Sequence, residues 1–404
     1  MGCHQVIDGL RPFDLRTFRR LILYDQAVRV LFVSENIGGH RTFHRHIEQA
    51  LHAHPEVEAR YVHVPPPRLG RRIVGAAVPG LGRFDLDLQP ARAQFAAAAI
   101  ARRLVRPYVD EVDVVHWYTA NSALLCLDVV GKKPSVVSLD MTNAQNSRRL
   151  PYRYPTRFTP MVTRPVAALE RRVYERADAV VTKSEWAAAS VRDDYGIDAD
   201  KVWAHAFGIV PGPRPRPRPH RRPTIAFAGT TLERKGGRRL IDVWRADLRE
   251  HADLVLVTKD EVPAEDGLRV VRDVNVGDSR IDLILDGAAV FAFPSTMDAS
   301  PHVVFEAMAR ALPVIVCRSG GMPEQVVDGE TGFVAEPDDS GDLADALRAL
   351  IGDPALARRL GDAGRLLVEE RFDMNKQIVP FLELLGAVSG RGRGAVNGRT
   401  YAAG

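Results

Sequence analysis

Cysteine is scarce in this chain of 404 residues, which holds only Cys3, Cys126 and Cys317. The three residues are scattered, odd in number and far from any metal-ligand spacing. This pattern argues against a disulfide framework and against a zinc site, and it favours a reducing cytoplasm. We expect neither a metal nor another cofactor.

Long apolar runs are missing as well. No run approaches the roughly 20 residues that span a bilayer, and no cleavable signal pattern is present. The opening Met-Gly-Cys-His-Gln-Val lacks the Ser or Thr of a myristoylation signal. With 46% hydrophobic and 26% charged residues, the composition is that of a soluble globular enzyme. We expect a cytoplasmic protein, with peripheral contact at the inner membrane face as an open alternative.

The small net charge of +4 hides an asymmetry between the two halves of the chain. Residues 1–220 carry a balance of +10 and the remainder carries −6. A basic amino-terminal half could attract an anionic acceptor, an anionic membrane surface or nucleic acid, or its arginines could simply cover solvated faces. No helix-turn-helix, finger or aromatic-plus-basic RNA motif accompanies the charge, so we expect no nucleic-acid partner.

Length and composition predict at least two domains of ~150 residues. The clearest boundary is PGPRPRPRPHRRP, residues 211–223, where alternating prolines favour a stiff extended linker. We expect an extension at 1–27 with an amphipathic stretch (a helix on the domain or membrane, or a loose leader), a first domain at 28–210 and a second at 224–372. A helix at 373–388 should cross back onto the first domain, and the tail 389–404 should be disordered.

The first domain opens with an apolar strand at residues 28–34, followed by the pair Gly38-Gly39 and a helix. Glycines at such a turn allow a phosphate to approach the backbone, although the full G-x-G-x-x-G fingerprint is absent. At the helix start, His40, Arg41 and His44 are candidate acceptor-binding residues, or else ordinary surface polar residues. A later strand, residues 134–139, ends at Asp140, either an acid for chemistry or a turn residue.

The second domain repeats the pattern. The strand at residues 224–228 leads into GTTLERKGG, which places Arg234 and Lys235 at a strand-to-helix turn, where cations could neutralise a diphosphate. Further strands are expected at 253–257, 268–271 and 290–293.

Residues 290–332 are predicted to form a strand, a loop, a helix, a strand, a Gly-rich turn and a helix. Ser300-Pro301 has the form of an N-cap followed by a first-turn proline. Spacing places Glu306 and Arg310 on one helix face as an i, i+4 pair. By spacing alone, this pair and the loop acid Asp298 could be ordinary solvated charges.

The same stretch resembles the donor site of retaining glycosyltransferases with two Rossmann-like domains (family 4, group 1, GT-B fold). The motifs are D-x₇-E-A-M-A, L-P-V-I-V, G-G-M-P-E and D-G-E-T-G-F-V, in that order over more than forty residues. The resemblance implies an α/β fold with two parallel sheets flanked by helices, facing across a cleft. It also implies sugar transfer from a nucleoside diphosphate sugar, with UDP or GDP as the expected nucleotide, with retained configuration and without a metal.

By resemblance, Glu306 binds the ribose, Asp298 the donor sugar, and Lys235 with Arg234 the diphosphate. Gly38 and Gly39 contact the diphosphate beside the acceptor pocket. The other donor-binding positions are Thr231, Asp273, Val274, Ser300, Pro301, His302 and Val303. The catalytic set comprises Asp140, Asp298, Lys235 and Arg234.

This chain departs from the family pattern at several positions. Thr230 stands where the family has arginine, Asp298 where it usually has glutamate, and Asp140 where many members have histidine. The donor sugar, and a small-molecule, lipid-linked or glycan acceptor, stay open. So do the alternatives of a nucleotide-sugar epimerase and a non-catalytic nucleotide-sugar-binding protein. The D-x-D sequence Asp85-Leu86-Asp87 is interpreted as incidental.

Overall fold

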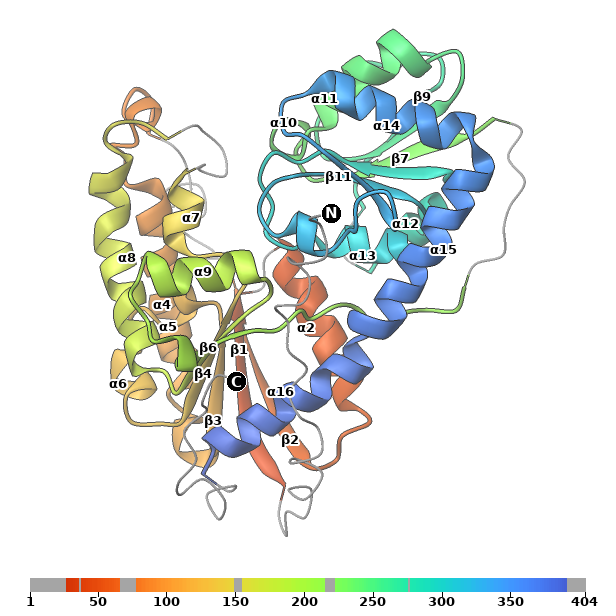
Figure 1. Cartoon of the computed structure of the whole chain (residues 1–404). Helices are drawn as coiled ribbons and strands as arrows, with labels where there is room; N and C mark the ends of the chain where they lie inside the picture. The colour runs from red at the N-terminus through yellow and green to blue at the C-terminus, as the bar shows by residue number, and fades with distance from the viewer. Residues whose placement is uncertain are drawn as a thin grey trace.

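The computed structural model describes two α/β domains, each built around a parallel six-stranded sheet (Figure 1). It covers residues 27–35, 38–65, 78–148, 155–214, 222–274 and 277–390. The expectations for residues 1–26, for 215–221 of the linker and for the tail beyond Gly390 lie outside this described part.

The sheet of the first domain has the order β2-β1-β3-β4-β5-β6. Its inner strands are apolar and rich in β-branched residues, as expected for strands that helices cover on both faces. The strands are β1 (Val28–Glu35), β2 (Val57–Val64), β3 (Val114–Tyr118), β4 (Ser135–Leu139), β5 (Ala179–Thr182) and β6 (Val202–Ala204).

Seven α-helices within the described part of residues 28–210 flank this sheet. They are α2 (Gly38–Leu51), α4 (Gln89–Val105), α5 (Ala120–Ala123), α6 (Leu127–Val130), α7 (Asn143–Arg148), α8 (Thr159–Arg176) and α9 (Glu185–Asp193). Between α5 and α6 the chain turns at residues 124–126. Helix α9 is capped by Ser184, whose side chain accepts a hydrogen bond from the Ala187 amide at 3.2 Å.

The sheet of the second domain has the order β12-β11-β10-β7-β8-β9. Its strands are β7 (Thr224–Ala228), β8 (Asp253–Val257), β9 (Leu268–Val271), β10 (Val290–Phe293), β11 (Val314–Cys317) and β12 (Gly332–Ala335). The helices are α10 (Leu232–Lys235), α11 (Gly237–Val243), which continues as a π-helical turn at Trp244–Leu248, α12 (Ser279–Asp286), α13 (His302–Met308), α14 (Ser340–Gly352) and α15 (Pro354–Arg371).

Two local expectations for the second domain are wrong. The Gly-rich turn after β11 leads into a 3₁₀ turn at Met322–Glu324 instead of an α-helix. Helix α13 begins at His302 with Pro301 in the N-cap position, so Ser300 does not cap it. The Ser300 hydroxyl instead accepts a hydrogen bond from the Gln325 side chain at 3.2 Å.

The last helix, α16 (Met374–Val388), packs on the first domain, where Figure 1 shows it as the blue helix that follows α15. Its residues Ile378 and Phe381 are fully buried in the same apolar cluster as Val30 and Phe43. The end of the first domain and the start of this last helix lie side by side, because Ile209 and Asp373 form an isolated β-bridge.

Candidate functional site

In the second domain, the candidate site lies where the strand order reverses. Strands β7 and β10 are adjacent, although two other strands, β8 and β9, lie between them in the chain. In open parallel sheets, the space beyond the carboxyl ends at such a reversal is where ligands bind. The loop after β7 carries Arg234 and Lys235, and the loop after β10 carries Asp298.

A glycine brings these two loops together. Gly236 has a φ of +75°, and a Cβ atom at this position would lie 1.9 Å from the Pro294 carbonyl oxygen. Only glycine tolerates both the left-handed backbone and this approach. The turn that ends α10 is therefore held directly against the end of β10.

Lys235 and Asp298 form an ion pair between the two loops. Both side chains are largely covered, with 13% and 14% of their surfaces exposed. Burial lowers the pKa of Lys235, the Asp298 charge opposes this effect, and neighbouring Arg234 adds to it. The two residues to which the family resemblance gives the diphosphate and the donor sugar are thus in direct contact.

Polar groups beside this pair lack partners. Within the described residues, the buried hydroxyl oxygens of Thr231 and Thr296 make no hydrogen bond. Arg234 is half-buried and forms no ion pair there, whereas Thr230 is exposed. Buried polar atoms that lack hydrogen-bond partners beside an ion pair are typical of a site that binds a polar ligand.

Glu306 does not pair with Arg310, so the interpretation as a solvated i, i+4 pair is wrong. The Arg310 guanidinium instead binds two acids of α12, Asp282 and, at 3.1 Å, Asp286. Burial raises the pKa of Glu306, with Arg45 and then Arg310 opposing the shift. This leaves the Glu306 carboxylate available at the domain interface.

Arg45 is a site residue that the sequence did not reveal. It lies on α2 of the first domain, yet a Cβ atom added to Gly277 of the second domain would lie 2.5 Å from its Nη1 atom. Its charge also acts on Glu306. No motif marks Arg45, because its position depends on how the two domains meet.

Two of the candidate donor-binding residues follow the carboxyl end of β9. Asp273 is exposed and has a φ of +60°, and its carbonyl oxygen accepts a hydrogen bond from Arg280 at 2.7 Å. Val274 is half-buried and packs against the apolar core. Val303, another candidate donor-binding residue, packs on the same core from α13.

The first domain presents polar residues at the ends of its own strands. Asp140 follows β4, and its carboxylate lies 3.7 Å from the His40 imidazole. Burial acts to raise the pKa of Asp140, but the His40 contact and the Lys183 charge outweigh it and lower this pKa. Asp140 also accepts a hydrogen bond from the Met141 amide at 3.0 Å. It is therefore both a turn residue and a charged group at the interface.

Lys183 is the second residue that the sequence missed. It follows β5, whose last residue pairs with the last residue of β4, so Lys183 and Asp140 leave neighbouring strands. Its ammonium lies 4.0 Å from the centre of the Phe43 ring and 5.0 Å from that of Tyr118. Burial lowers the pKa of Lys183 to about 8, against the effect of Asp140. The only signal in the sequence is a lysine directly after an apolar strand.

Lys183 also joins the two domains. Its Nζ atom lies 3.1 Å from Nε2 of His302, the first residue of α13. His302 thus faces the first domain, where it is buried between Phe43 and His46. Burial, and next the Lys183 charge, hold the pKa of His302 well below its usual value.

The candidate acceptor residues divide into three cases. His40 faces Asp140, Arg41 is exposed, and His44 is buried against Tyr118 with neither ring nitrogen hydrogen-bonded within the described residues. Burial lowers the pKa of His44 well below its usual value. The structure therefore does not offer His44 to an acceptor, because its ring fills the space between α2 and the sheet. Space is open around Gly39, and Gly38 is the first residue of α2.

The D-x-D sequence has a structural role. Asp85 accepts hydrogen bonds from the Thr156 amide and hydroxyl at 3.2 and 3.1 Å, and Asp87 accepts one from the Val78 amide at 3.1 Å. Both carboxylates serve to tie loops together. Within the described part, no group of three or more His, Cys, Asp or Glu side chains is arranged to hold a metal ion.

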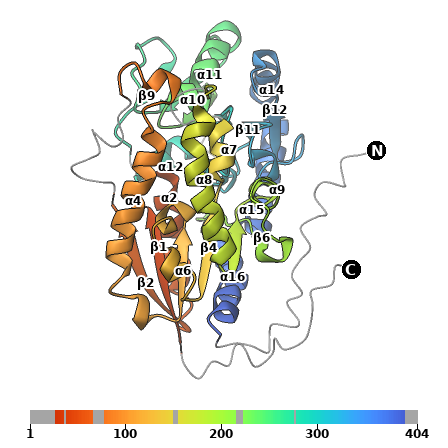
Figure 2. The ribbon, with the colours of Figure 1, turned by 90° about the vertical axis from the view of Figure 1, so that its left-hand side faces the viewer.

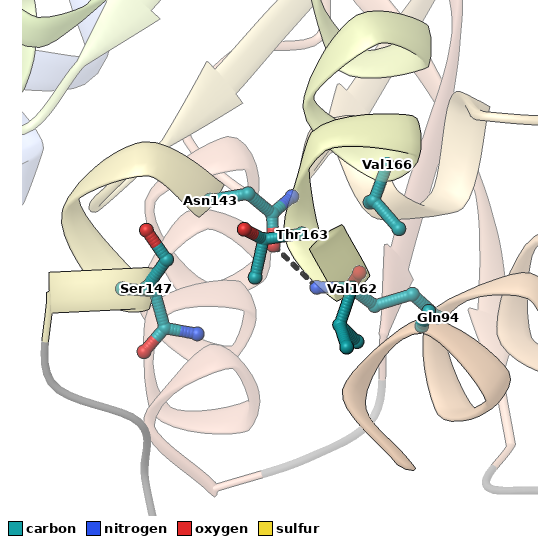
Figure 3. A pocket seen from close by; sticks show the side chains of 8 residues that line it. Gln94, Asn143, Ser147, Val162, Thr163 and Val166 are labelled. Atoms are coloured by element: carbon teal, nitrogen blue, oxygen red, sulfur yellow. Dashed lines mark hydrogen bonds between the residues drawn. The ribbon is translucent and has the colours of Figure 1, made fainter. Parts of the chain in front are cut away.

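A separate hollow lies between α4, α7 and α8 of the first domain (Figure 3). At its edge, the Gln94 side-chain amide donates to the Asn143 side-chain oxygen at 2.5 Å. The remaining lining residues are Ala91, Asn146, Ser147, Val162, Thr163 and Val166. Asn143 follows Asp140 by three residues, so the hollow adjoins the same edge of the sheet.

Both domains match known glycosyltransferase families. Residues 37–209 match "Glycosyltransferase Family 4", and residues 222–353 match "Glycosyl transferases group 1". The alpha-maltose-1-phosphate synthase of Mycolicibacterium smegmatis is 30% identical over 259 residues, which cover 55% of this chain and 66% of that protein. The chain spans between about two fifths and two thirds of the length of the first curated relatives that it matches.

Solved structures share the fold at low identity. Sucrose-phosphate synthase from Thermosynechococcus elongatus superposes with a TM-score of 0.70 at 18% identity, covering 89% of this chain and 99% of that one. Anabaena HepE in complex with UDP-glucose gives 0.63 at 16%, covering 88% and 100%. With a family match in each of its two domains, the chain belongs to the family 4, group 1 glycosyltransferases of the two-domain GT-B fold.

Proposed function

We propose that this protein transfers a sugar from a nucleoside diphosphate sugar to an acceptor, with retention of configuration and without a metal ion. The observation that carries the proposal is the buried Lys235–Asp298 pair at the reversal of the second sheet. It combines a cation for the departing diphosphate with an acid for the sugar. Asp140 of the first domain, with its neighbour His40, lies on the other side of the domain interface from this pair.

In this proposal, Lys235 and Arg234 bind the diphosphate of the donor. Arg234 has no protein counter-ion within the described residues, and Lys235 has one that a diphosphate could replace. Such fixed charges stabilise a leaving group most strongly where water is excluded. Glu306 would bind the ribose hydroxyls, since its carboxylate is not engaged by Arg310. The solved complex of HepE with UDP-glucose supports a nucleotide-sugar donor.

The reaction breaks the bond between the anomeric carbon and the diphosphate oxygen and forms one to an acceptor oxygen. The electron pair of the broken bond leaves with the diphosphate, and the proton of the acceptor hydroxyl must be removed. For retention without a covalent intermediate, the acceptor attacks from the face that the diphosphate leaves. Asp298 would orient the sugar hydroxyls, and Asp140 with His40 lies where it could orient the sugar or accept that proton.

We further propose that the enzyme acts in the cytoplasm. Cys126 and Cys317 are buried and free of disulfides, which fits a reducing compartment. Fractionation of cells that express the full chain, followed by thiol labelling under denaturing conditions, should find the protein in the cytoplasmic fraction with both thiols reduced. Quantitative oxidation would contradict this placement.

Donor binding is tested by calorimetry with a panel of UDP- and GDP-sugars. We expect at least one donor to bind, and Lys235→Met to lower transfer roughly 100-fold through loss of a leaving-group contact. Lys132→Met, an exposed lysine of the first domain, is the matched control. If no nucleotide sugar binds, the donor site is wrongly assigned. Binding without transfer to any acceptor would point to a non-catalytic protein, and turnover of the donor alone to an epimerase.

Retention and metal independence have separate measurements. Proton NMR of the product should show the anomeric configuration of the donor, and an inverted product would refute retention. Activity should persist after treatment with a chelator. Loss of activity that Mg²⁺ or Mn²⁺ restores would refute metal independence.

A further inference from the structure

In the segment 78–88 of the first domain, the usual placement of apolar side chains inside and charged side chains outside is reversed. Its apolar side chains face solvent, and its two acids are buried. Five apolar residues of this segment have between 38% and 49% of their surface exposed: Val78, Leu81, Phe84, Leu86 and Leu88. Single exposed apolar residues are ordinary, but five within eleven positions are not.

The burial of the acids explains how this reversal is held. Asp85 binds the backbone and hydroxyl of Thr156 at the approach to α8, and it also accepts from the Thr159 hydroxyl. Asp87 binds the Val78 amide at 3.1 Å. Leu86 and Leu88 alternate in the sequence with these fixed acids, and both are exposed.

A second segment, 155–165, extends the same surface. Met161 is 65% exposed at the start of α8. Because Asp85 binds both Thr156 and Thr159, this segment is tied directly to 78–88. We call the exposed side chains of Val78, Leu81, Phe84, Leu86, Leu88 and Met161 the apolar patch.

The charge around the apolar patch is of one sign. Arg83, Arg157 and Arg164 are exposed and form no ion pair among the residues that the structure describes. Residues 78–109 contain no acid besides Asp85 and Asp87, and residues 155–169 contain none. Two of these arginines lie over aromatic rings, Arg83 over Phe84 and Arg157 over Phe158, and none of the three has a carboxylate partner among the described residues. An apolar surface with such arginines beside it complements an anionic lipid surface.

The apolar patch lies at the amino-terminal ends of α4 and α8, which Figure 2 shows side by side. Helices that follow parallel strands begin at the carboxyl edge of the sheet. The apolar patch is therefore at the same edge as Asp140, with the hollow of Figure 3 between α4, α7 and α8 beside it.

We propose that the apolar patch docks this protein on an anionic lipid bilayer, with the carboxyl edge of the first sheet toward the membrane. The leucine and phenylalanine side chains enter the boundary between headgroups and acyl chains, and the three arginines bind lipid phosphates. Lipid binding by the apolar patch is expected whether or not the protein carries out the proposed sugar transfer.

Co-sedimentation of the full chain with vesicles tests the proposal. We expect binding to phosphatidylglycerol–phosphatidylcholine vesicles at least ten-fold stronger than to pure phosphatidylcholine, and weaker binding at high salt. The triple variant Leu81→Ser/Phe84→Ser/Leu88→Ser should lose at least ten-fold in binding. The charge variant Arg83→Gln/Arg157→Gln/Arg164→Gln should bind anionic and neutral vesicles equally. It tests the proposal independently if the serine variant does not fold.

The matched control is Leu283→Ser/Leu366→Ser, which changes leucines of the second domain that are 56% and 57% exposed. This variant should bind vesicles like the unchanged protein. Equal loss in the control, or no binding of the unchanged protein to anionic vesicles, would overturn the proposal. So would a dimer in light scattering that the triple variant converts to monomer, because the patch would then be covered by a second copy.

Discussion

The Lys183 ammonium and the His302 imidazole meet across the domain interface, with Nζ 3.1 Å from Nε2 and both residues buried. When Lys183 is charged it can only donate, so Nε2 accepts and the neutral ring carries its proton on Nδ1. The contact thus couples the position of α13, and of the loop that holds Asp298, to the strand ends of the first domain.

Replacing Lys183 by Met should lower kcat/KM at neutral pH by about ten-fold or more, because the contact that positions α13 is lost. In the unchanged enzyme, the pKa of Lys183 near 8 predicts that activity falls as the pH rises through 8. In Lys183→Arg, whose side chain stays protonated, this alkaline fall in activity should move to higher pH. An alkaline limb at the same pH in the Arg variant would show that another group titrates.

The same pKa predicts a stability effect with a defined sign. An unfolded lysine titrates near 10.4 and the folded Lys183 near 8, so between these values the unfolded state binds more protons. This residue therefore adds to stability as the pH rises from about 8 to 10. Denaturant unfolding should show a smaller rise, or a larger fall, over this range in Lys183→Met than in the unchanged protein.

Glu306→Ala should weaken donor binding several-fold or more, because the carboxylate that is proposed to hold the ribose is removed. Calorimetry with the best donor measures this effect. Glu250→Ala, at an exposed position of the same domain outside the donor motifs, should leave affinity unchanged. If Glu306→Ala binds the donor as tightly as the control does, the ribose assignment is wrong.

Asp298→Asn should separate the two functions of the Lys235–Asp298 pair. The uncharged side chain no longer competes for the Lys235 ammonium, so binding of free UDP or GDP should be equal or tighter. Transfer should fall at least ten-fold, because the sugar loses a carboxylate contact. Calorimetry and turnover are measured on the same preparation. Weaker nucleotide binding together with weaker transfer would instead indicate a purely structural pair.

Gly236→Ala should destabilise the fold by roughly 2 kcal/mol or more, since the new Cβ atom meets the Pro294 carbonyl in a left-handed backbone. Gly352→Ala is the control, with no atom within 4 Å of its Cβ and no positive φ. Urea unfolding compares the two. Equal stability would mean that the two loops can move apart at little cost.

Local sequence determined much of the second domain. The strands expected at 224–228, 253–257, 268–271 and 290–293 have these bounds in the structure. Each is a short apolar run, and such runs are typical of strands buried in a parallel sheet. Glycine and proline also marked the turns between them. The donor motif indicated Lys235, Asp298 and Glu306 because their spacing is local or shared with a known family.

Only the tertiary structure decided which of these charges meet. Arg310 could pair with Glu306 by helical spacing, but it binds α12, whose acids come from another part of the chain. Lys183, Arg45 and the burial of His44 depend on strand order and on the contact between domains, which periodicity does not encode. The sequence thus specified the strands and the donor motif, whereas the pairing of charges followed from distant segments packing together, where burial makes each unpaired charge costly.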